Sequence, residues 1–388
     1  MKVAIVHDYI KEYGGAERVL ESLHNVFPKA PVFTSVYLPS YLGPHRPRFE
    51  SWDIRTSWAQ YLPFKAKLIS PLRLIAPFLF SQFDFSKFDV VIVSATGAYS
   101  SNMIKKGSAR QISYVHTPPR YLYGYETARD WKKNIITRSI GHLAIHFLRI
   151  IDYKSSQNVD YFIANSQETK KRIQKFYRKD AAVIYPPVDV NSIRQKNGGR
   201  NSSLRKKDYF LAGGRLARAK NPDLIIRAFL KNGLQLKIFG KSFGGYGSYI
   251  KNQIANSKYT NKKSNIKFLG EVSDEEKDEL MMNAKAFVFA SADEDFGIVP
   301  VEAMMHGTPV IAHRSGGVLE TVIEPSASSG QEATGLFFDE FSIESLNTAI
   351  KKFERMKFDP SQITKHAQKF SKERFEREIK AFIASKTK

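Results

Sequence analysis

The chain has 388 residues, of which 42% are hydrophobic and 25% charged, with no cysteine and a formal net charge of +22. A chain of this length exceeds what one hydrophobic core usually supports, and its apolar content excludes a disordered protein, so we expect two globular domains. The absence of cysteine excludes disulfide bonds and thiolate catalysis, and it fits a reducing compartment.

The positive charge favours anionic partners such as phosphates or acidic lipid surfaces. We find no zinc-finger pattern, RNP-like stretch or concentrated basic stripe, so no nucleic-acid partner is expected. A strand-like run begins at Val3 with no signal peptide before it, and the longest apolar stretch, 68–80, is too short to span a membrane. These features predict a cytoplasmic protein, with peripheral contact at the anionic inner face of the cell membrane as an option.

Short aliphatic runs alternate with helical patterns along the whole chain, which is typical of parallel sheets built from β-α-β units. The candidate strands are 3–7, 32–36, 90–94, 111–116 and 161–165 in the first half and 209–212, 236–239, 266–269, 286–289 and 309–312 in the second. Because the pattern begins again, the sequence predicts an α/β fold with two Rossmann-like domains.

A polar segment containing glycine and serine, 194–207, has almost nothing to bury and is expected to link the domains. The N-terminal domain is then 1–193 and the C-terminal domain 208–365, and a terminal helix in 366–388 is expected to cross back to the first domain. Ligands of doubly wound sheets bind beyond the carboxyl ends of the strands, so two facing sheets would form one interdomain cleft.

Two adjacent glycines, Gly14 and Gly15, follow the first strand and precede a helical apolar pattern. They allow backbone N–H groups to approach a phosphate or a sugar at the N-terminus of the next helix. The same residues suit an ordinary strand-to-helix turn equally well. They do not form the G-x-G-x-x-G pattern of a nicotinamide-binding site.

The segment 58–85 is dense in aromatic and aliphatic residues, with Lys65, Lys67 and Arg73 among them. It suits either contact with a membrane surface or a lipid-linked acceptor, or ordinary core and crossover structure, and its prolines weaken the case for an amphipathic helix. The apolar and basic run at 140–151 has the same two interpretations.

In the second half, two glycines follow the candidate strand 209–212. Arg215 and Lys220 lie between these glycines and a helix that begins at Pro222. The planar guanidinium and the compact ammonium group together suit a diphosphate whose negative charge grows as a bond to it breaks. A basic surface turn is the alternative interpretation.

Two glutamates, Glu294 and Glu302, are separated by seven residues across a loop and the start of a helix, with Phe296 and Gly297 between them. This pattern resembles the signature of retaining GT-B glycosyltransferases, particularly family 4. The resemblance implies the GT-B fold, in which two Rossmann-like domains with parallel sheets face one another. It also implies a nucleotide-sugar donor and a glycan or polyprenyl-linked acceptor.

The resemblance implies that Glu294 contacts donor-sugar hydroxyls near the reacting carbon and that Glu302 binds the ribose hydroxyls, roles that suit ionised carboxylates. It assigns the donor-binding turn to Phe296, Gly297, Ile298 and Val299. The stretch 213–220 is similar to the family's diphosphate turn, and 314–320 resembles a glycine turn beside the donor phosphates.

The stretch 114–121 resembles the family segment whose histidine reaches the donor sugar, so His116 is a second catalytic candidate. A lone histidine at a strand end is otherwise more often structural. The residues 14–18 and 114–121 are most similar to those of mannosyltransferases of bacterial O-antigen or exopolysaccharide assembly. This similarity indicates GDP-mannose as the donor.

One turn departs from the family pattern. After strand 236–239 the chain has Gly-Lys-Ser-Phe-Gly-Gly at 240–245 instead of a Gly-Asp-Gly-like turn, which leaves the nucleobase contacts open. Lys241 in this turn either adds positive charge to the site or is solvated. No metal-ligand spacing such as H-E-x-x-H and no D-x-D pair occurs, so we expect no metal ion and no other cofactor.

Two enzymatic alternatives share this architecture, a nucleotide-sugar 2-epimerase and a phosphorylase. Epimerisation of a sugar without any acceptor would favour the epimerase. A basic nucleic-acid-binding protein is the alternative from another class, and salt-sensitive retention on heparin without nucleotide-sugar binding would favour it.

Overall fold

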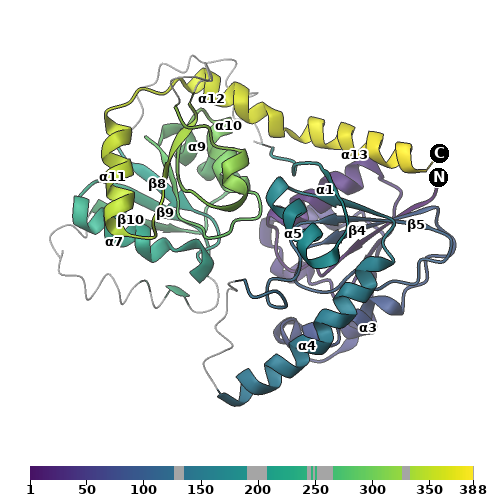
Figure 1. Cartoon of the computed structure of the whole chain (residues 1–388). Coiled ribbons are helices and arrows are strands. Elements are labelled where there is room, and N and C mark those ends of the chain that lie inside the picture. Colours follow the sequence, from purple (N-terminus) through teal and green to yellow (C-terminus); the bar gives the residue numbers. More distant parts are fainter. Residues whose placement is uncertain are drawn as a thin grey trace. The chain divides into compact units, whose positions relative to one another are not determined.

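The computed structural model divides the chain into two compact units, each built around one parallel sheet (Figure 1). Unit 1 consists of Met1–Glu126, Asp130–Pro187 and Lys372–Lys388, and unit 2 of Val188–Ser371 together with Thr127–Arg129. The structure describes residues 1–125, 135–189, 208–242, 246–247, 250, 265–325 and 333–387, except for the side chains of 135–140. The predicted linker, 194–207, lies outside these residues.

The sheet of unit 1 has seven strands in the order β3-β2-β1-β4-β5-β6-β7, and all of its pairings are parallel. The strands are β1 (Val3–His7), β2 (Val32–Thr34), β3 (Ile54–Thr56), β4 (Val90–Ala95), β5 (Arg110–Val115), β6 (Tyr161–Ala164) and β7 (Ala182–Val183). The central strands β1 and β4 are buried along their whole length, which explains why their residues do not alternate between apolar and polar.

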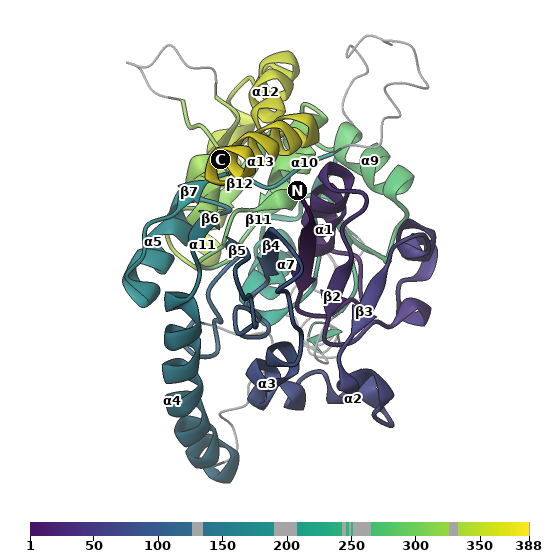
Figure 2. The ribbon, with the colours of Figure 1, turned by 90° about the vertical axis from the view of Figure 1, so that its right-hand side faces the viewer.

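Helices and short turns cover both faces of this sheet (Figure 2). The helices are α1 (Gly15–Val26), α2 (Lys65–Leu68), α3 (Ala76–Ser81), α4 (Ile135–Gln157), α5 (Gln167–Tyr177) and α13 (Lys372–Lys386). On one face, Ile5 and Ile92 pack in a cluster with residues of α1 and α13, and on the other face Val6 and Val93 pack against residues of 58–85. The alternation of side chains along each strand thus produces two separate cores.

The chain returns to unit 1 at Lys372, rather than at 366 as the sequence suggested. Residues just before this point pack within unit 2, where the ring of Phe370 lies edge-on to Phe296 at 5.5 Å between ring centres. From Lys372 onward, α13 places Phe375, Ile379 and Ile383 in the core of unit 1 beside α1 (Figure 1). The i, i+4, i+8 spacing of these three side chains gives the helix one apolar face.

The sheet of unit 2 has six strands in the order β10-β9-β8-β11-β12-β13, again with only parallel pairings. The strands are β8 (Phe210–Gly213), β9 (Leu236–Phe239), β10 (Ile266–Gly270), β11 (Phe287–Phe289), β12 (Val310–His313) and β13 (Gly335–Phe338). The helices are α7 (Pro222–Asn232), α9 (Asp274–Asn283), α10 (Ile298–Met305), α11 (Ile343–Glu354) and α12 (Pro360–Ala367).

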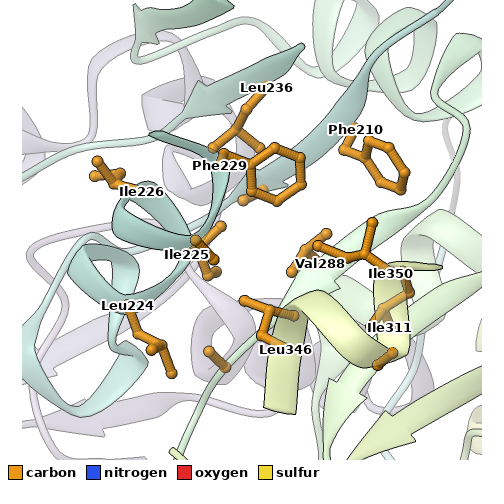
Figure 3. Close-up of a cluster of buried hydrophobic side chains, with 14 of the residues drawn as sticks. Phe210, Leu224, Ile225, Ile226, Phe229, Leu236, Val288, Ile311, Leu346 and Ile350 are labelled. Atoms are coloured by element: carbon orange, nitrogen blue, oxygen red, sulfur yellow. The ribbon is translucent and has the colours of Figure 1, made fainter. Parts of the chain in front are cut away.

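A large hydrophobic cluster in unit 2 joins the sheet to α7 and α11 (Figure 3). Phe210 and Val288 come from neighbouring strands, Phe229 from α7, and Leu346 and Ile350 from α11. Burial of each such side chain contributes roughly 1.5–3 kcal/mol. The cluster therefore anchors β8 and β11, whose carboxyl ends carry the candidate site.

All ten strands predicted from the sequence are present, within two residues or fewer at each end. Three further strands, β3, β7 and β13, were not predicted. All three lie at sheet edges. β3 and β7 have only three and two residues, too few for an apolar run to be recognised, because an edge strand is specified by its neighbour as much as by its own side chains.

The segment 58–85 is partly core structure and partly exposed. It forms two 3-10 turns, Trp58–Tyr61 and Pro71–Leu74, together with α2 and α3. Leu79 and Phe80 are fully buried in the core of unit 1, whereas the Phe64 side chain is 77% exposed and Phe78 56%. Within the described residues, no helix is long and apolar enough to cross a membrane.

Candidate functional site

β8 ends at Gly213 and the turn after it begins with Gly214, and neither position suits a larger residue. A Cβ on Gly213 would lie 2.4 Å from the ring of Phe239, and Gly214 has a φ of +106°. Gly240, which follows β9, has a φ of +121°, and a Cβ there would lie 1.8 Å from the Gly214 carbonyl oxygen. Glycine is therefore required for the turns after β8 and β9 to touch at the carboxyl edge of the sheet.

Arg215 and Lys220 line one pocket at this edge. Its walls come from the ends of β8, β9 and β11 and from the start of α7, and they include the apolar side chains of Ile225, Ile238 and Val288. The structure thus brings the two predicted cations together. The pocket lies at the carboxyl ends of parallel strands of unit 2, where ligands of such sheets bind.

Glu294 lies beside Lys220 in the loop after β11. Lys220 Nζ and Glu294 Oε2 form an ion pair, and the Ser291 hydroxyl donates to the same carboxylate oxygen at 2.6 Å. The Lys220 side chain is 34% exposed and the Glu294 side chain 13%. Lys220 also lies 5.4 Å from the centre of the Phe289 ring, which favours a cation there. These contacts hold an ammonium group and a carboxylate next to each other at the edge of the pocket.

The loop that carries Glu294 is fixed by two glycines after β12, in the stretch that resembles a phosphate-binding turn. The Gly317 amide donates to the Glu294 carbonyl oxygen at 2.7 Å. A Cβ on Gly316, which has a φ of +67°, would lie 2.3 Å from the same oxygen, and a Cβ on Gly317 would lie 2.5 Å from the Asp295 carbonyl oxygen. In this structure the two glycines serve the placement of Glu294 through backbone contact.

α10 begins directly after this loop, with Gly297 as its N-cap at a φ of +91°. Backbone N–H groups at a helix N-terminus favour anions, and Ile298 and Val299 are the first two residues of this helix. The Val299 side chain also lies 3.5 Å from where a Cβ of Gly214 would be, which joins the start of α10 to the turn after β8. Phe296 differs: its ring is 2% exposed and packs on Phe370, so its side chain contributes to the core.

Glu302 lies further along α10 and is 4% exposed. Its Oε1 accepts a hydrogen bond from Lys277 Nζ at 3.0 Å, and Lys277 also lies 3.3 Å from Asp274 Oδ1. A buried carboxylate needs such a partner to remain ionised. Lys277, on α9, is therefore part of the arrangement around Glu302, although the sequence gave no signal for it.

Lys241, the departure from the family pattern, is exposed. Its ammonium group lies 3.4 Å from a carboxylate oxygen of Glu271, with both side chains about 70% exposed. Of the two interpretations that the sequence left open, the structure favours a solvated lysine.

In unit 1, Gly14 is the N-cap of α1 and Gly15 is the first residue of that helix. The Gly14 N–H donates to Glu17 Oε2 at 2.9 Å, so this amide already has an acceptor within the chain. Burial opposes ionisation of Glu17, but its interactions with His7 and with backbone amides outweigh this effect and lower its pKa. A negative charge near the start of α1 is thereby supplied by the protein itself.

His116 follows β5 and is connected to β4 and β1 by hydrogen bonds. Its Nε2 lies 3.0 Å from the Ser94 hydroxyl, and the same hydroxyl lies 3.1 Å from His7 Nδ1. The His116 backbone is held as well, because its N–H donates to Ala95 O at 2.9 Å and its carbonyl oxygen accepts from Thr169 Oγ1 at 3.2 Å. The sequence predicted His116 at a strand end, and the structure adds three buried partners, Ser94, Ala95 and Thr169.

Asp8 organises the neighbouring loop of unit 1. It is fully buried, and its Oδ2 accepts from Thr96 Oγ1 at 2.5 Å and from the amides of Ala98 and Tyr99 at 3.2 and 3.0 Å. Burial raises the pKa of Asp8, against the opposing effects of the His7 charge and these hydrogen bonds. In the same loop, a Cβ on Gly97 would lie 2.6 Å from the Thr117 carbonyl oxygen.

Several of these residues were absent from the sequence-based site. Asp8 follows β1 directly and Ser291 lies two residues after the end of β11, so their positions carried a signal that could have identified them. Ser94, Glu17 and Lys277 carried no such signal, because only the packing of neighbouring elements brings them to the site. Among the described residues, no group of three or more histidine, aspartate or glutamate side chains is placed to hold a metal ion.

Sequence profiles of two glycosyltransferase families match the chain one after the other. The Glycosyltransferase Family 4 profile matches residues 13–192, and the profile named Glycosyl transferases group 1 matches residues 194–373. The first match corresponds to most of unit 1 and the second to unit 2.

Two curated relatives match parts of the chain. The alpha-1,3/1,6-mannosyltransferase ALG2 of Candida albicans is 29% identical over 242 residues, which are 49% of this chain and 54% of the relative. The O-antigen chain mannosyltransferase RfbU of Salmonella typhimurium is 31% identical over 176 residues, 42% of this chain and 45% of the relative. The chain thus spans about half the length of these relatives.

Solved structures with the same fold match the chain over its length. HepE of Anabaena in complex with UDP has a TM-score of 0.67 at 19% identity, over 99% of this chain and 100% of that chain. The lipopolysaccharide outer core galactosyltransferase WaaB, in its apo form, has a TM-score of 0.67 at 18% identity, over 100% of both chains. At these identities the likeness shows a shared fold.

The contact between Gly316 and the Glu294 loop gives a prediction about stability. We expect Gly316→Ala to lower the free energy of unfolding by more than Gly270→Ala. Both residues have positive φ, which costs alanine about 1–2 kcal/mol, but only Gly316 faces a backbone atom where its Cβ would be. The additional overpacking should cost roughly 1–3 kcal/mol. Urea unfolding of the two variants measures the difference, and equal losses would show that the contact is not a constraint.

Proposed function

We propose that the chain, which resembles mannosyltransferases in sequence and GT-B glycosyltransferases in fold, transfers mannose from GDP-mannose to a hydroxyl group of a glycan or polyprenyl-linked acceptor. Transfer is proposed to retain the anomeric configuration. The relatives named as mannosyltransferases support the choice of sugar.

The observation that carries this proposal is the ion pair of Lys220 with Glu294 at the pocket that Arg215 lines. A nucleotide sugar needs cations at its diphosphate and hydrogen-bond acceptors at its hydroxyls a few ångströms away. The two loops at the carboxyl ends of the adjacent strands β8 and β11 supply both. A diphosphate bound here would compete with Glu294 for Lys220 and would thereby release the carboxylate to accept from sugar hydroxyls.

The proposed reaction breaks the bond between the anomeric carbon and the diphosphate oxygen and forms a bond from that carbon to the acceptor oxygen. The acceptor proton passes to an oxygen of the departing diphosphate. Arg215, Lys220 and the N-terminus of α10 stabilise the negative charge that develops there, so we propose that no metal ion is required.

A panel of GDP, UDP and ADP sugars tests the donor. We expect GDP-mannose to raise the unfolding temperature most, because a ligand present at 100 times its Kd stabilises the folded state by about 2.7 kcal/mol. Turnover with a saccharide acceptor should persist in EDTA. Stabilisation by UDP sugars alone would replace the proposed donor, and release of an epimerised sugar without an acceptor would support the epimerase.

Replacement of Glu294 separates donor binding from transfer. We expect Glu294→Ala to lower kcat by about 100-fold or more, the typical cost of losing a hydrogen bond that acts in the transition state, while the affinity for nucleotide stays the same or rises. The affinity is retained because Lys220 loses its internal partner. Calorimetric titration with nucleotide and single-turnover kinetics measure the two effects.

Lys220→Ala and Arg218→Ala form the matched comparison for this experiment. Both residues are cations of the same 3-10 turn, but only Lys220 reaches Glu294 and lines the pocket. Lys220→Ala should weaken nucleotide binding, whereas Arg218→Ala should change it little. Equal losses in both variants would indicate general surface charge, and unchanged turnover of Glu294→Ala would remove the role proposed for that carboxylate.

We also propose that unit 1 contacts an anionic lipid surface through the exposed part of 58–85 and α4. Tyr61 is 86% exposed and Phe64 77%, with the ammonium group of Lys67 5.9 Å from the Phe64 ring centre. Leu143 and Phe147 are exposed on α4, which lies toward the same side of unit 1 as α3 (Figures 1 and 2). Aromatic side chains beside lysines suit the headgroup region of an acidic membrane.

Vesicle sedimentation tests this contact. The protein should bind vesicles that contain phosphatidylglycerol and not vesicles of phosphatidylcholine alone, and the paired change Tyr61→Ser with Phe64→Ser should reduce binding several-fold. Phe268→Ser, at a 42% exposed aromatic residue of unit 2, is the control. Binding that is independent of lipid charge, or that both sets of variants reduce equally, would exclude this surface.

A further inference from the structure

A series of polar side chains crosses the middle of the sheet of unit 1. Glu17 on α1 faces His7 at the end of β1, His7 contacts Ser94 on β4, and Ser94 contacts His116 after β5. The strands β1, β4 and β5 are neighbours in the sheet. We call these four residues the polar series.

The register of the sheet explains why these side chains meet. His7 and Ser94 are direct partners across the parallel pair β1 and β4, so their side chains leave the sheet on the same face. Ser94 is in turn opposite Tyr114 on β5, and His116 lies two residues further along, on that same face. The contact is therefore built into the strand pairing and does not depend on a flexible loop.

Burial makes these contacts consequential. His7 and Ser94 are fully buried, and Glu17 is 5% exposed. Buried polar groups that lack a partner cost roughly 1–3 kcal/mol, so each hydrogen atom in the polar series has a preferred place. Each group in the polar series therefore has a defined role as hydrogen-bond donor or acceptor toward its neighbour.

These roles follow from Glu17. Glu17 Oε2 accepts from the Gly14 N–H at 2.9 Å, and His7 Nε2 lies 3.9 Å from Glu17 Oε1 with no hydrogen-bonded partner of its own. A buried carboxylate attracts the N–H form of that nitrogen and repels its lone pair. In the neutral form of His7 the proton is then on Nε2, which leaves Nδ1 as an acceptor.

The remaining hydrogen atoms are then determined. The Ser94 hydroxyl has one hydrogen, which it donates to His7 Nδ1, so its oxygen is left to accept from the next group. That group is His116 Nε2, 3.0 Å away. His116 must therefore carry its proton on Nε2.

We propose that Glu17, His7 and Ser94 are positioning residues that hold His116 in one ring orientation and as the Nε2–H tautomer for sugar transfer. His116 alone would touch the donor, and the other three act through it. The proposal rests on the proposed function only for its effect on turnover. The tautomer itself is a property of the protein without a substrate.

The first test is nitrogen NMR of protein labelled with 15N-histidine. It is recorded at pH 8, where an ordinary histidine side chain is neutral and carries one ring proton. The His116 signals are assigned by comparison with His116→Asn. We expect the Nε2–H pattern in the wild-type protein. In Ser94→Ala we expect a mixture of both tautomers, because the ring nitrogen has lost its partner.

Glu17→Gln separates charge from helix capping. The glutamine side-chain oxygen can still accept from the Gly14 N–H, as Glu17 Oε2 does at 2.9 Å, but the negative charge beside His7 is gone. We expect His116 to shift toward a tautomer mixture while the unfolding temperature changes little. This variant keeps the test valid if Ser94→Ala folds poorly.

The second test measures turnover with the sugar donor that the nucleotide-sugar panel identifies. Ser94→Ala should lower kcat about 3- to 10-fold with little change in the KM for the donor, since one neutral hydrogen bond is lost. Ser94→Thr retains the hydroxyl and should restore most of the rate. Ser113→Ala is the control, because Ser113 is an equally buried serine on β5 that takes no part in the polar series.

An Nδ1–H pattern for His116 in the wild-type protein, or a Ser94→Ala spectrum identical to that of the wild type, would overturn the proposal. So would equal losses of kcat in Ser94→Ala and Ser113→Ala. If the wild-type protein transfers no sugar at all, the proposed function fails, and the NMR result still decides whether the polar series sets the His116 tautomer.

Discussion

Direct backbone contact between loops at the carboxyl ends of parallel strands is the constraint on which both groups of candidate residues depend. In unit 2, Gly316 touches the Glu294 loop and Gly240 touches the turn after β8, each at a distance that no Cβ could occupy. In unit 1, Gly97 has the same relation to Thr117. Only glycine permits such approach, and the approach leaves each functional side chain few alternative positions.

Opposite charges are arranged in pairs in a protein with a net charge of +22. Lys220 with Glu294 and Lys277 with Glu302 place both signature glutamates against lysines. Each pair lies at or below the protein surface, where the Coulomb interaction is stronger than in water. Under the proposed function, an anionic ligand would replace a glutamate as the partner of a lysine. The charges at the site would therefore rearrange when the ligand binds.

The fold was largely predictable from the sequence, and the site only in part. Buried central strands such as β1 and β4 consist of consecutive apolar residues that hardly any other local structure explains, so their positions were found within a residue or two. The edge strand β7 has two residues and no pattern of its own. The burial of the Phe296 side chain was not predicted either, because a motif gives the order of residues but not which side chains point into the core.

By itself, the sequence determined the number of sheets and the central strands, because these follow from local periodicity. It also located the turns that carry Arg215, Lys220, Glu294 and His116 and the helix that carries Glu302, because these follow from short spacings along the chain. Only the tertiary structure decided that Lys220 pairs with Glu294 and that Ser94 joins His7 to His116. These contacts bridge residues 74, 87 and 22 positions apart. They exist because parallel strands distant in sequence place their carboxyl ends side by side, and strand pairing of that kind leaves no signature in any one segment.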